Sequence, residues 1–435
     1  MIKSKTVANA GWIIGCRIVQ SVLAIIVSML TARYLGPSNF GLINFAASIV
    51  TFVSPIATLG LSNVLVQEII YSPESEGKIL GTSITMSLVS SVFCIIGVVS
   101  FSLITNPNEK DTVIVCALYS LMLIAQALEI IQYWFQAKLI SKYTAVVSVI
   151  AYIVISLYKI FLLITGKSVY WFAVSNAIDY FIIGCVLLVI YKIKNNNSKL
   201  QFSLDWAKRL FGKSKYFIIS SMMVTIFAQL DKIMLKYMID DKATGIYSAA
   251  CACAGMTSFL FLAIIDSMRP TIMGCKKSNS PFYEVNVCRL YSIVIYLALA
   301  QSLFITIFAK PIILVLYGAE YIESVVVLMF FVWQTTFSYM GSVRNMWMLA
   351  ENKQQYLWII NLSGVVMNII LNVFLIQILG AVGAAIATVI TQFFTNFVLG
   401  IILKPIRYNN LLIIKSLNPK LLIDIIKSFI CRNHS

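Results

Sequence analysis

The sequence contains few charged residues and almost no histidine. Only 11% of its 435 residues are Asp, Glu, Lys or Arg, whereas a soluble domain has about 25%. The single histidine, His434, lies next to the C-terminus, and the nine cysteines show neither metal-ligand nor disulfide spacing. HExxH and Walker motifs are also missing. We therefore expect no zinc chemistry, no ATP hydrolysis and no cofactor.

Apolar residues dominate the composition. They make up 60% of the chain, and the mean hydropathy is +0.89. Apolar stretches of about twenty residues or more, the length that crosses a bilayer core about 30 Å thick, recur along the whole sequence. The pattern predicts an all-α integral membrane protein with about twelve transmembrane helices, at residues 11–34, 40–66, 79–104, 112–135, 143–165, 169–191, 216–237, 245–268, 290–309, 325–349, 356–377 and 381–403.

The basic residues predict the orientation of these helices. The net charge is +16, and most of the 33 Lys and Arg residues lie in loops and tails that face the cytoplasm if the N-terminus does. The loops on the opposite side hold only Arg33, Lys110, Lys167, Lys242 and Lys310. Basic loops remain cytoplasmic and meet anionic lipid headgroups. We therefore expect both termini in the cytoplasm, contacts with membrane lipids and no binding of nucleic acid.

Polar side chains follow one face of two predicted helices. Residues three or four apart share a helix face, and such faces are formed by Ser221, Thr225, Gln229, Lys232 and Lys236 in one helix and by Arg17, Gln20, Ser21, Ser28 and Thr31 in the other. A lysine at the centre of a span costs about 2.5–3.5 kcal/mol. Polar faces of this kind usually line a bundle interior or a water-filled cavity, so we expect a wet cavity.

The basic residues within spans outnumber the acidic ones, so this cavity is expected to be cationic. It would attract an anion such as a phosphate, and its amides and hydroxyls would bind a sugar. The candidate substrate-binding residues are Arg17, Gln20, Lys159, Gln229, Lys232 and Arg344. An alternative for Arg17, Arg344 and Lys236 is that they lie near helix ends and extend to the headgroups.

Three acids and one proline complete the candidates. Glu129, Asp179 and Asp231 are candidates for a coupling ion. Asp179 needs a partner or a proton inside a span, and a buried pair with Lys159 is favoured over a proton relay. Pro55 lies in the middle of the predicted helix 40–66 and removes a backbone hydrogen bond, which predicts a kink that is either a hinge or a static bend.

A shift of 204 residues places the beginning of the chain on its middle. Arg17 then falls on Ser221, Ser28 on Lys232 and Gly41 on Gly245. With one residue of slippage, Arg33-Tyr34-Leu35 also corresponds to Lys236-Tyr237-Met238. Duplicated sets of helices are common in transporters. We predict an N-terminal six-helix bundle at 1–200, a C-terminal six-helix bundle at 201–403 and a basic amphipathic cytoplasmic tail at 404–435. Apolar residues between 202 and 211 predict a short helix on the membrane surface.

Several motifs resemble those of a known family. They are Leu35-Gly36-Pro37-Ser38-Asn39-Phe40-Gly41, Gly60-Leu61 with Gln67-Glu68, Gln229-Leu230-Asp231-Lys232-Ile233-Met234-Leu235 with Gly245-Ile246-Tyr247-Ser248-Ala249, and the run from Gly380 to Thr388. Each motif is weak by itself, but their order and spacing are specific and cover nearly the whole chain. The sequence looks like a Wzx-type O-antigen flippase, from the polysaccharide transporter branch of the multidrug/oligosaccharidyl-lipid/polysaccharide superfamily.

The resemblance implies two six-helix bundles around a central cavity in a bacterial inner membrane. It implies alternating-access translocation of undecaprenyl-diphosphate-linked O-antigen, or related surface polysaccharide, repeat units from the cytoplasmic to the periplasmic leaflet. It also implies an O-antigen polymerase and a chain-length regulator as candidate partners. Twelve helices match this branch, whereas the lipid II flippases of the superfamily usually have fourteen.

Two other functions remain open at this stage. A multidrug cation antiporter of the same fold would be expected to have an acidic cavity. A membrane glycan polymerase or ligase would be expected to have a large outer loop with catalytic groups, and the outer loops here are short.

Overall fold

The computed structural model describes residues 2–195 and 199–418, except for the side chains of residues 2–14, 16–18 and 63. All regular elements in these ranges are helical, which confirms the predicted all-α class. The chain divides into two compact units after Gly245. The first unit contains α1 (Ile2–Ala57), α2 (Ser62–Tyr71), η1 (Pro73–Ser75), α3 (Glu76–Thr105), α4 (Lys110–Ser120), α5 (Met122–Glu129), α6 (Gln132–Ala137), α7 (Lys142–Ile164), α8 (Val169–Lys194), α9 (Leu204–Met238) and the start of α10 (Asp241–Gly255).

The second unit contains the rest of α10 and the elements that follow it. These are α11 (Ser258–Lys277), α12 (Phe282–Ile307), α13 (Ala309–Leu316), η2 (Ala319–Tyr321), α14 (Ser324–Ala350), η3 (Gln354–Tyr356), α15 (Leu357–Leu379), α16 (Ala381–Phe393), a π-helical turn η4 (Phe394–Val398), α17 (Leu399–Ile402), η5 (Lys404–Ile406) and α18 (Arg407–Ser416).

Eleven helical stretches in the described part of the chain are long and apolar enough to cross a membrane. The number is one below the predicted twelve because the first two predicted helices are joined in α1 and counted once. Gly36 interrupts α1 with φ 71° and ψ 170°, a conformation that glycine adopts readily because it has no Cβ. The broken run α4–α6 forms a single span, and α10 is too short to be counted.

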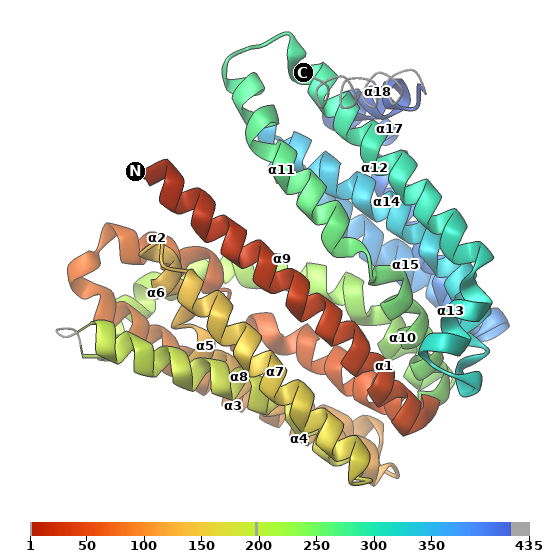
Figure 1. The fold of residues 1–435 in the computed structure, drawn as a ribbon, viewed down its shortest axis with the longest axis horizontal. Helices are drawn as coiled ribbons and strands as arrows, with labels where there is room; N and C mark the ends of the chain where they lie inside the picture. The colour runs from red at the N-terminus through yellow and green to blue at the C-terminus, as the bar shows by residue number, and fades with distance from the viewer. Residues whose placement is uncertain (1, 196–198, 419–435) are drawn as a thin grey trace. The chain divides into compact units, whose positions relative to one another are not determined.

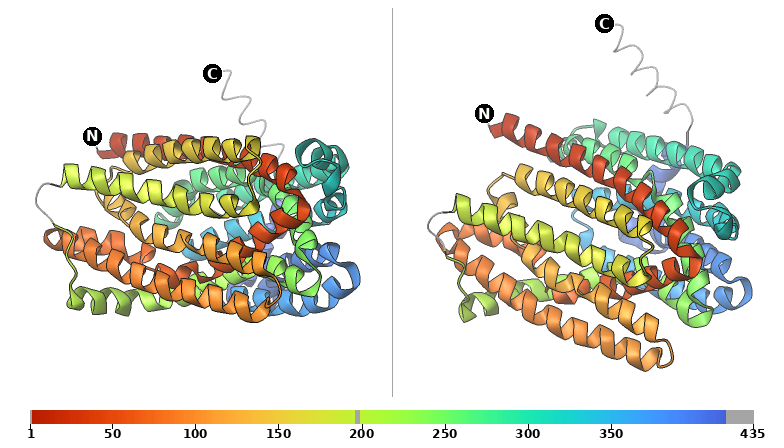
Figure 2. Two further views of the ribbon diagram at one scale, coloured as in Figure 1. Left: turned by 90° about the horizontal axis from the view of Figure 1, so that it is seen from below. Right: turned by 60° about the horizontal axis from the view of Figure 1, so that its bottom comes forward.

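In the first unit, α1 is the helix on which the others assemble. It packs against α7 and α9, and α7 runs alongside α8 (Figures 1 and 2). One buried cluster around Trp134, Leu65 and Leu210 joins α2, α6 and α9. A second cluster around Phe45 and Tyr119 joins α1 to α4 and α8.

The second unit is built on α14. This helix packs against α12 and α16, and α15 packs against α16 (Figure 1). Trp347 and Tyr291 are fully buried at its centre, and Phe261 stacks on Tyr339 with ring centroids 3.9 Å apart. The last described helix, α18, packs on α12 and buries Ile413 in the same cluster.

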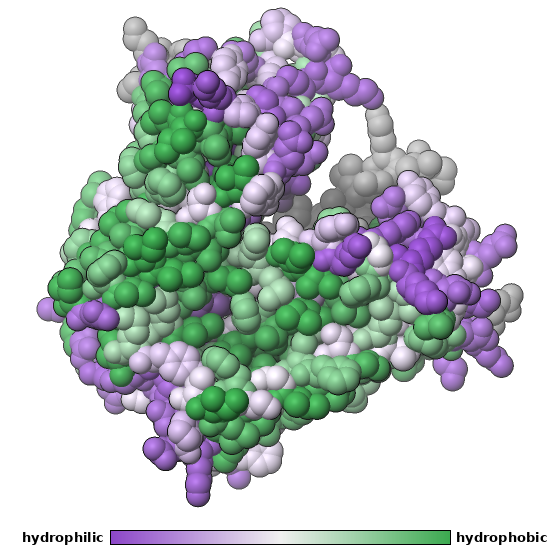
Figure 3. All heavy atoms as spheres, turned by 180° about the vertical axis from the view of Figure 1, so that it is seen from behind, coloured by the Kyte–Doolittle hydropathy of each residue, from purple (hydrophilic) through white to green (hydrophobic). Residues whose placement is uncertain are grey.

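Large apolar side chains are exposed along the spanning helices. They include Phe93 and Ile96 on α3, Leu157 and Phe161 on α7, and Phe374 on α15. Figure 3 shows one face of the molecule, on which apolar side chains dominate and hydrophilic ones gather towards the margins. Such a surface is unsuited to water and suited to lipid tails.

Three predicted helix boundaries are wrong. The helix predicted to reach residue 66 ends at Ala57, because Leu59 and Gly60 have φ values of 52° and 59° and turn the chain into α2. Residues 204–211 form no separate surface helix but the first turns of the continuous α9. The helix predicted at 245–268 is divided between α10 and α11, and α11 continues to Lys277.

The first unit extends 45 residues beyond the predicted end of the first bundle. It includes α9 because this helix packs on α1, α2 and α3. The division into bundles at 1–200 and 201–403 remains a prediction. Only the beginning of the predicted tail, to residue 418, lies within the described residues; there α18 buries Asn409 and Asn410 and exposes Arg407 and Lys415.

Candidate functional site

Three neighbouring cavities lie among α1, α2 and α4 to α8 of the first unit. Their volumes are about 540, 210 and 160 Å³. The first and second share Glu129, Gln132 and Tyr180, and the first and third share Ala24 and Tyr152. The shared residues make the three cavities neighbours, and their polar lining is called the polar path. Its other polar side chains are Gln20, Ser21, Gln136, Ser141, Thr144, Ser148 and Asp179 in the first cavity, Ser54, Thr58, Ser62, Gln126 and Tyr133 in the second, and Ser28, Thr31, Asn44, Tyr119, Lys159 and Asn176 in the third.

The polar path follows from the helical spacing of its residues. On α7, Thr144, Ser148 and Tyr152 are four residues apart and therefore share one face. That face lies against the stripe of α1, where the Gln20 Nε2 donates a hydrogen bond to the Ser148 carbonyl at 2.9 Å. The sequence predicted the α1 stripe; it missed the α7 stripe, although the same four-residue spacing could have revealed it.

Lys159 is the basic side chain of the polar path. Its Nζ donates a hydrogen bond to Oδ1 of Asn176 at 3.3 Å, so α7 is joined to α8 at this point. The predicted direct ion pair with Asp179 is not formed: no ion pair of these two side chains within 4 Å occurs among the described residues. The Asp179 Oδ1 is buried and has no hydrogen-bond partner there. The ammonium of Lys159 therefore has hydrogen-bonding capacity left for another acceptor.

The two acids of the polar path lie on different helices. Glu129 ends α5 and Asp179 lies on α8, and both line the largest cavity. Around them the donors Gln132, Tyr152 and Tyr180 line the same space. No cluster of three or more His, Cys, Asp or Glu side chains with metal-site geometry occurs in the described residues. The assignment of Glu129 and Asp179 to a coupling ion remains a prediction.

The polar face of α9 meets α1 in the same unit. The Oε1 of Gln229 accepts hydrogen bonds from Ser48 Oγ at 3.0 Å and from Lys232 Nζ at 3.4 Å. Two predicted site residues, Gln229 and Lys232, are therefore in contact with each other. They lie outside the three cavities, so the structure does not bring them together with Lys159. Asp231, the third acid, is buried with 7% of its surface exposed.

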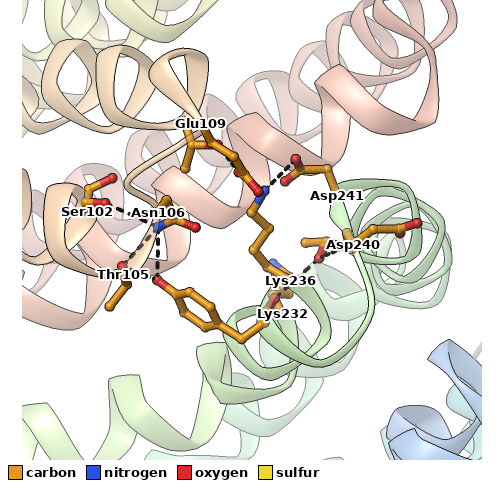
Figure 4. Close-up of polar contacts among 11 residues, drawn as sticks. Ser102, Thr105, Asn106, Glu109, Lys232, Lys236, Asp240 and Asp241 are labelled. Atoms are coloured by element: carbon orange, nitrogen blue, oxygen red, sulfur yellow. Dashed lines mark hydrogen bonds and ion pairs between the residues drawn. The ribbon is translucent and has the colours of Figure 1, made fainter.

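Lys236 lies one helical turn beyond Lys232 and is enclosed by two carboxylates. Its side chain is 4% exposed, and its Nζ donates to Glu109 Oε2 at 2.5 Å and to Asp241 Oδ2 at 2.6 Å (Figure 4). These three residues form the Lys236 cluster. Hydrogen bonding to Lys236 lowers the pKa of Glu109, whereas burial raises the pKa of Asp241 against the opposing effect of Lys236. Sequence reasoning missed this cluster, because Glu109 is 127 residues away along the chain.

Arg344 lies in the second unit and is 5% exposed. Its Nη1 donates to the Thr395 carbonyl at 2.7 Å, and its Nη2 donates to Oδ1 of Asn345 at 3.1 Å. Thr395 belongs to the π-helical turn η4, in which backbone carbonyls lose their usual i+4 donors. Asn410 of α18 supplies a second external donor, to the Phe397 carbonyl at 2.7 Å. This placement gives Arg344 a structural role in holding η4.

Arg17 and Pro55 are the remaining predicted residues. The side chain of Arg17 lies outside the described residues. Pro55 lies in the last turn of α1, shortly before the start of α2, and the backbone around it remains helical. The break in α1 is at Gly36. A hinge at Pro55 remains a prediction.

The comparisons identify the family. Residues 6–274 match the family described as "Polysaccharide biosynthesis protein". The chain belongs to this family. The match covers more than half of the chain, including the whole polar path and the Lys236 cluster. A comparison with curated proteins found no match.

Solved structures with the same fold are transporters of the MOP superfamily. An inward-facing multidrug resistance MATE family transporter has a TM-score of 0.66 at 12% identity, over 91% of this chain and 96% of that chain. The lipid II flippase MurJ in an inward closed conformation has a TM-score of 0.66 at 16% identity, over 95% and 92%. A MOP transporter from Pyrococcus furiosus Vc1 has a TM-score of 0.65 at 12% identity, over 95% and 96%. At these identities the likeness establishes the fold.

This member of the polysaccharide biosynthesis family is thus a multi-pass membrane protein with a transporter fold. The predicted family resemblance is confirmed. Of the predicted site residues, the structure places Gln20, Lys159, Glu129 and Asp179 along the polar path, and it places Gln229 in contact with Lys232 outside the three cavities.

Proposed function

We propose that this chain is a flippase that translocates lipid-linked saccharides, with the polar path as the place where the saccharide binds. The observation that carries the proposal is the combination of a polar path with a lysine inside a membrane protein of the polysaccharide biosynthesis family. The largest of the three cavities, about 540 Å³, lies within the range of about 300–1,000 Å³ that holds small ligands.

The lining chemistry favours a sugar. Amide side chains offer both donors and acceptors, and hydroxyls offer the same in one group. The largest cavity is lined by Gln20, Gln132 and Gln136 and by several hydroxyls. A saccharide presents hydroxyls in many directions, so a lining of this kind can satisfy it without any single dominant contact.

Lys159 is the residue that we assign to the phosphate end of the substrate. Its Nζ has only one hydrogen bond, a long one at 3.3 Å, among the described residues. An ammonium forms stronger, charge-assisted bonds with phosphate oxygens than with a neutral amide. We propose undecaprenyl diphosphate as the lipid carrier and O-antigen or a related surface polysaccharide repeat unit as its cargo. Lys232 and Arg17 are further candidates for the diphosphate.

The proposed direction is from the cytoplasmic to the periplasmic leaflet by alternating access. Moving negative charge outwards across an inside-negative membrane is favourable by about 2.3 kcal/mol per charge for each 100 mV. Both termini would be cytoplasmic, as the loop charges predict. Glu129, Asp179 and Asp231 are the acids that we assign to any coupling ion. An O-antigen polymerase and a chain-length regulator remain predicted partners.

The test is translocation of a fluorescent undecaprenyl-diphosphate-linked saccharide in vesicles that contain the purified chain. Lys159→Gln should reduce the rate about 10- to 100-fold, since a hydrogen bond to a charged group contributes about 1.5–3 kcal/mol. Lys159→Arg should retain more activity, and Lys167→Gln, an exposed lysine after the same helix, should behave as wild type. No translocation by the wild-type chain would contradict the proposed function; an unaffected Lys159→Gln would contradict the site.

A multidrug cation antiporter is the second candidate. One observation favours it: Glu129 and Asp179 both line the largest cavity, whereas Lys159 lines a smaller one. Two carboxylates could bind an organic cation. Efflux of a fluorescent cationic dye by the wild-type chain, lost in Glu129→Gln and Asp179→Asn and accompanied by no saccharide translocation, would favour this function instead.

A further inference from the structure

The Lys236 cluster joins three elements at one end of the first unit. Lys236 belongs to α9, Glu109 lies in the turn between α3 and α4, and Asp241 begins α10. Next to it, the hydroxyl of Tyr237 is 2.8 Å from Thr105 Oγ1 and accepts a hydrogen bond from Asn106 Nδ2 at 3.3 Å (Figure 4). The end of α9 is therefore fastened to the α3–α4 turn by both an ion pair and a hydrogen-bonded tyrosine.

The two carboxylates stabilise the buried ammonium of Lys236, and that ammonium becomes unfavourable if they move away from it. A buried ammonium that loses its counter-ions keeps the cost of desolvation without the compensating attraction. Any movement of α9 away from the α3–α4 turn would separate Lys236 from Glu109. Such a movement needs a replacement anion or water at the Nζ.

Lys232 and Lys236 form a series along α9. They are four residues apart, which is a rise of about 6 Å along the helix axis on the same face. Lys232 contacts Gln229, and Lys236 contacts the two carboxylates. In the orientation predicted from the loop charges, Lys236 lies at the outer end of this series. Glu109 ends the α3–α4 turn, and the next residue, Lys110 at the start of α4, is one of the basic residues predicted to be outside.

We propose that Lys236 is a second anion-binding residue for the substrate diphosphate, on the outward side, which Glu109 and Asp241 occupy until the substrate replaces them. The inference rests on the proposed flippase function and adds to it a residue that was not among the predicted binding residues. Phosphate oxygens can take the places of the two carboxylate oxygens because both are charge-assisted acceptors for an ammonium. The exchange keeps the Nζ paired throughout.

Movement of α9 away from the α3–α4 turn would then depend on the substrate. Without a diphosphate, separating Lys236 from its carboxylates leaves an uncompensated cation, so the closed arrangement is favoured. With a diphosphate, the cation is paired in both arrangements. A ligand shifts an equilibrium only by its differential affinity for the two states, and Lys236 supplies such a difference.

The experiment uses a charge exchange to separate an anion site from a mere fastening. Lys236→Glu is combined with Glu109→Lys and Asp241→Asn, which restores one ion pair with reversed polarity. The contact between the end of α9 and the α3–α4 turn is followed in a full-length chain that keeps Cys116 as its single cysteine. This residue is fully buried and within electrostatic reach of Lys236 and Asp241. Its labelling by a maleimide reports opening, and translocation is measured with fluorescent undecaprenyl-diphosphate-linked saccharide in vesicles.

The proposal predicts that Lys236→Gln slows translocation at least about tenfold and raises Cys116 labelling. The charge exchange should restore protection of Cys116 but not translocation, because a glutamate cannot bind the diphosphate. If the charge exchange restored both Cys116 protection and translocation, Lys236 would have only a structural role and the proposal would be overturned. Normal translocation by Lys236→Gln would overturn it as well. Lys110→Gln, an exposed lysine next to Glu109, is the matched control.

The affinity for the fluorescent saccharide is a second measurement, which does not depend on movement of α9 or on translocation. Glu109→Gln with Asp241→Asn leaves Lys236 without its carboxylates, so this double variant should bind the same probe at least about threefold more tightly than wild type. Adding Lys236→Gln should cancel the gain. Equal binding by the double and triple variants would overturn the proposal. A wild-type chain that does not translocate the probe at all would instead overturn the proposed function, and this inference with it.

Discussion

Gly41 and Gly245 lie backbone against backbone in the first unit. A Cβ on Gly41 would be 2.7 Å from the nitrogen of Gly245 and 1.7 Å from the carbonyl oxygen of Asp241. A Cβ on Gly245 would be 3.0 Å from the nitrogen of Gly41 and 1.9 Å from the carbonyl oxygen of Pro37. The contact is reciprocal, and its partners Gly41 and Gly245 are separated by the same 204 residues as the predicted sequence repeat. This reciprocity is what a duplicated unit would produce.

Gly41→Ala is expected to separate α1 from α10. The added Cβ meets backbone atoms that cannot move aside as a flexible side chain could, and overpacking of this kind costs about 1–3 kcal/mol. The thermal unfolding midpoint of the purified chain should fall, and Cys116 in the single-cysteine chain should be labelled more readily because α10 begins with Asp241. Gly97→Ala on α3, where a Cβ meets nothing within 4 Å, is the control. Equal behaviour of the two variants would contradict the close contact.

The sequence predicts the helices of this protein well because their signal is local. Apolar length marks each span, and the three- and four-residue spacing of polar residues marks the cavity-lining face of α1 and the polar face of α9 that packs on it. The motifs with their order along the chain identified the family. The breaks in helices, such as those at Leu59 and at Met256, were missed because apolar composition continues through them.

The partners of charged residues could not be predicted in the same way. Lys236 was expected near a helix end, where extension to the headgroups would explain it, but its partner Glu109 is distant in sequence and is brought near by packing. Lys159 and Asp179 are close in sequence, yet Lys159 donates to Asn176 instead. Arg344 pairs with a backbone carbonyl that is free only because η4 is π-helical, a feature with no local sequence signal.

Glu68 is expected to be the most sensitive acid at the opposite end of α9. Its side chain is fully buried and forms ion pairs with Arg209, at 3.0 Å, and with Lys213, each of which is about half exposed. Glu68→Gln removes the charge from both contacts and should destabilise the chain by about 1.5–3 kcal/mol. The change in thermal unfolding measures this effect. Glu74→Gln, an exposed acid six residues further on, should have almost no effect, and a similar loss in both variants would show that Glu68 is not special.

The π-helical turn η4 is expected to depend on two side chains from other helices. Asn410→Ala leaves the Phe397 carbonyl without its donor, and Arg344→Gln removes the donor of the Thr395 carbonyl. An unsatisfied buried polar group costs about 1–3 kcal/mol, so each variant should unfold at lower temperature. Hydrogen exchange should also become faster in residues 394–402. Lys415→Ala, on the exposed face of the same α18, is the matched control for Asn410→Ala; unchanged exchange in both would contradict the role of Asn410.

Glu109 is expected to give the stability of the chain a specific dependence on pH. Donation by Lys236 holds the pKa of Glu109 below its ordinary value of 4.5. A carboxyl whose pKa is lowered by folding contributes stability that is fully present above the ordinary value and is lost as the pH falls through the lowered one. Asp241 acts in the opposite sense, because burial and the nearby charges of Glu109 and Asp240 raise its pKa against the effect of Lys236.

The difference in unfolding temperature between wild type and Glu109→Gln isolates the contribution of Glu109. The wild type should be the more stable chain near pH 7, and the difference should shrink below about pH 4.5 and vanish once Glu109 is protonated, because a protonated glutamate and a glutamine are both neutral. Glu320→Gln, an exposed acid in the second unit, should show no such trend. A difference that stays constant down to pH 3 would mean that the stability lost in Glu109→Gln does not come from the charge that Lys236 holds.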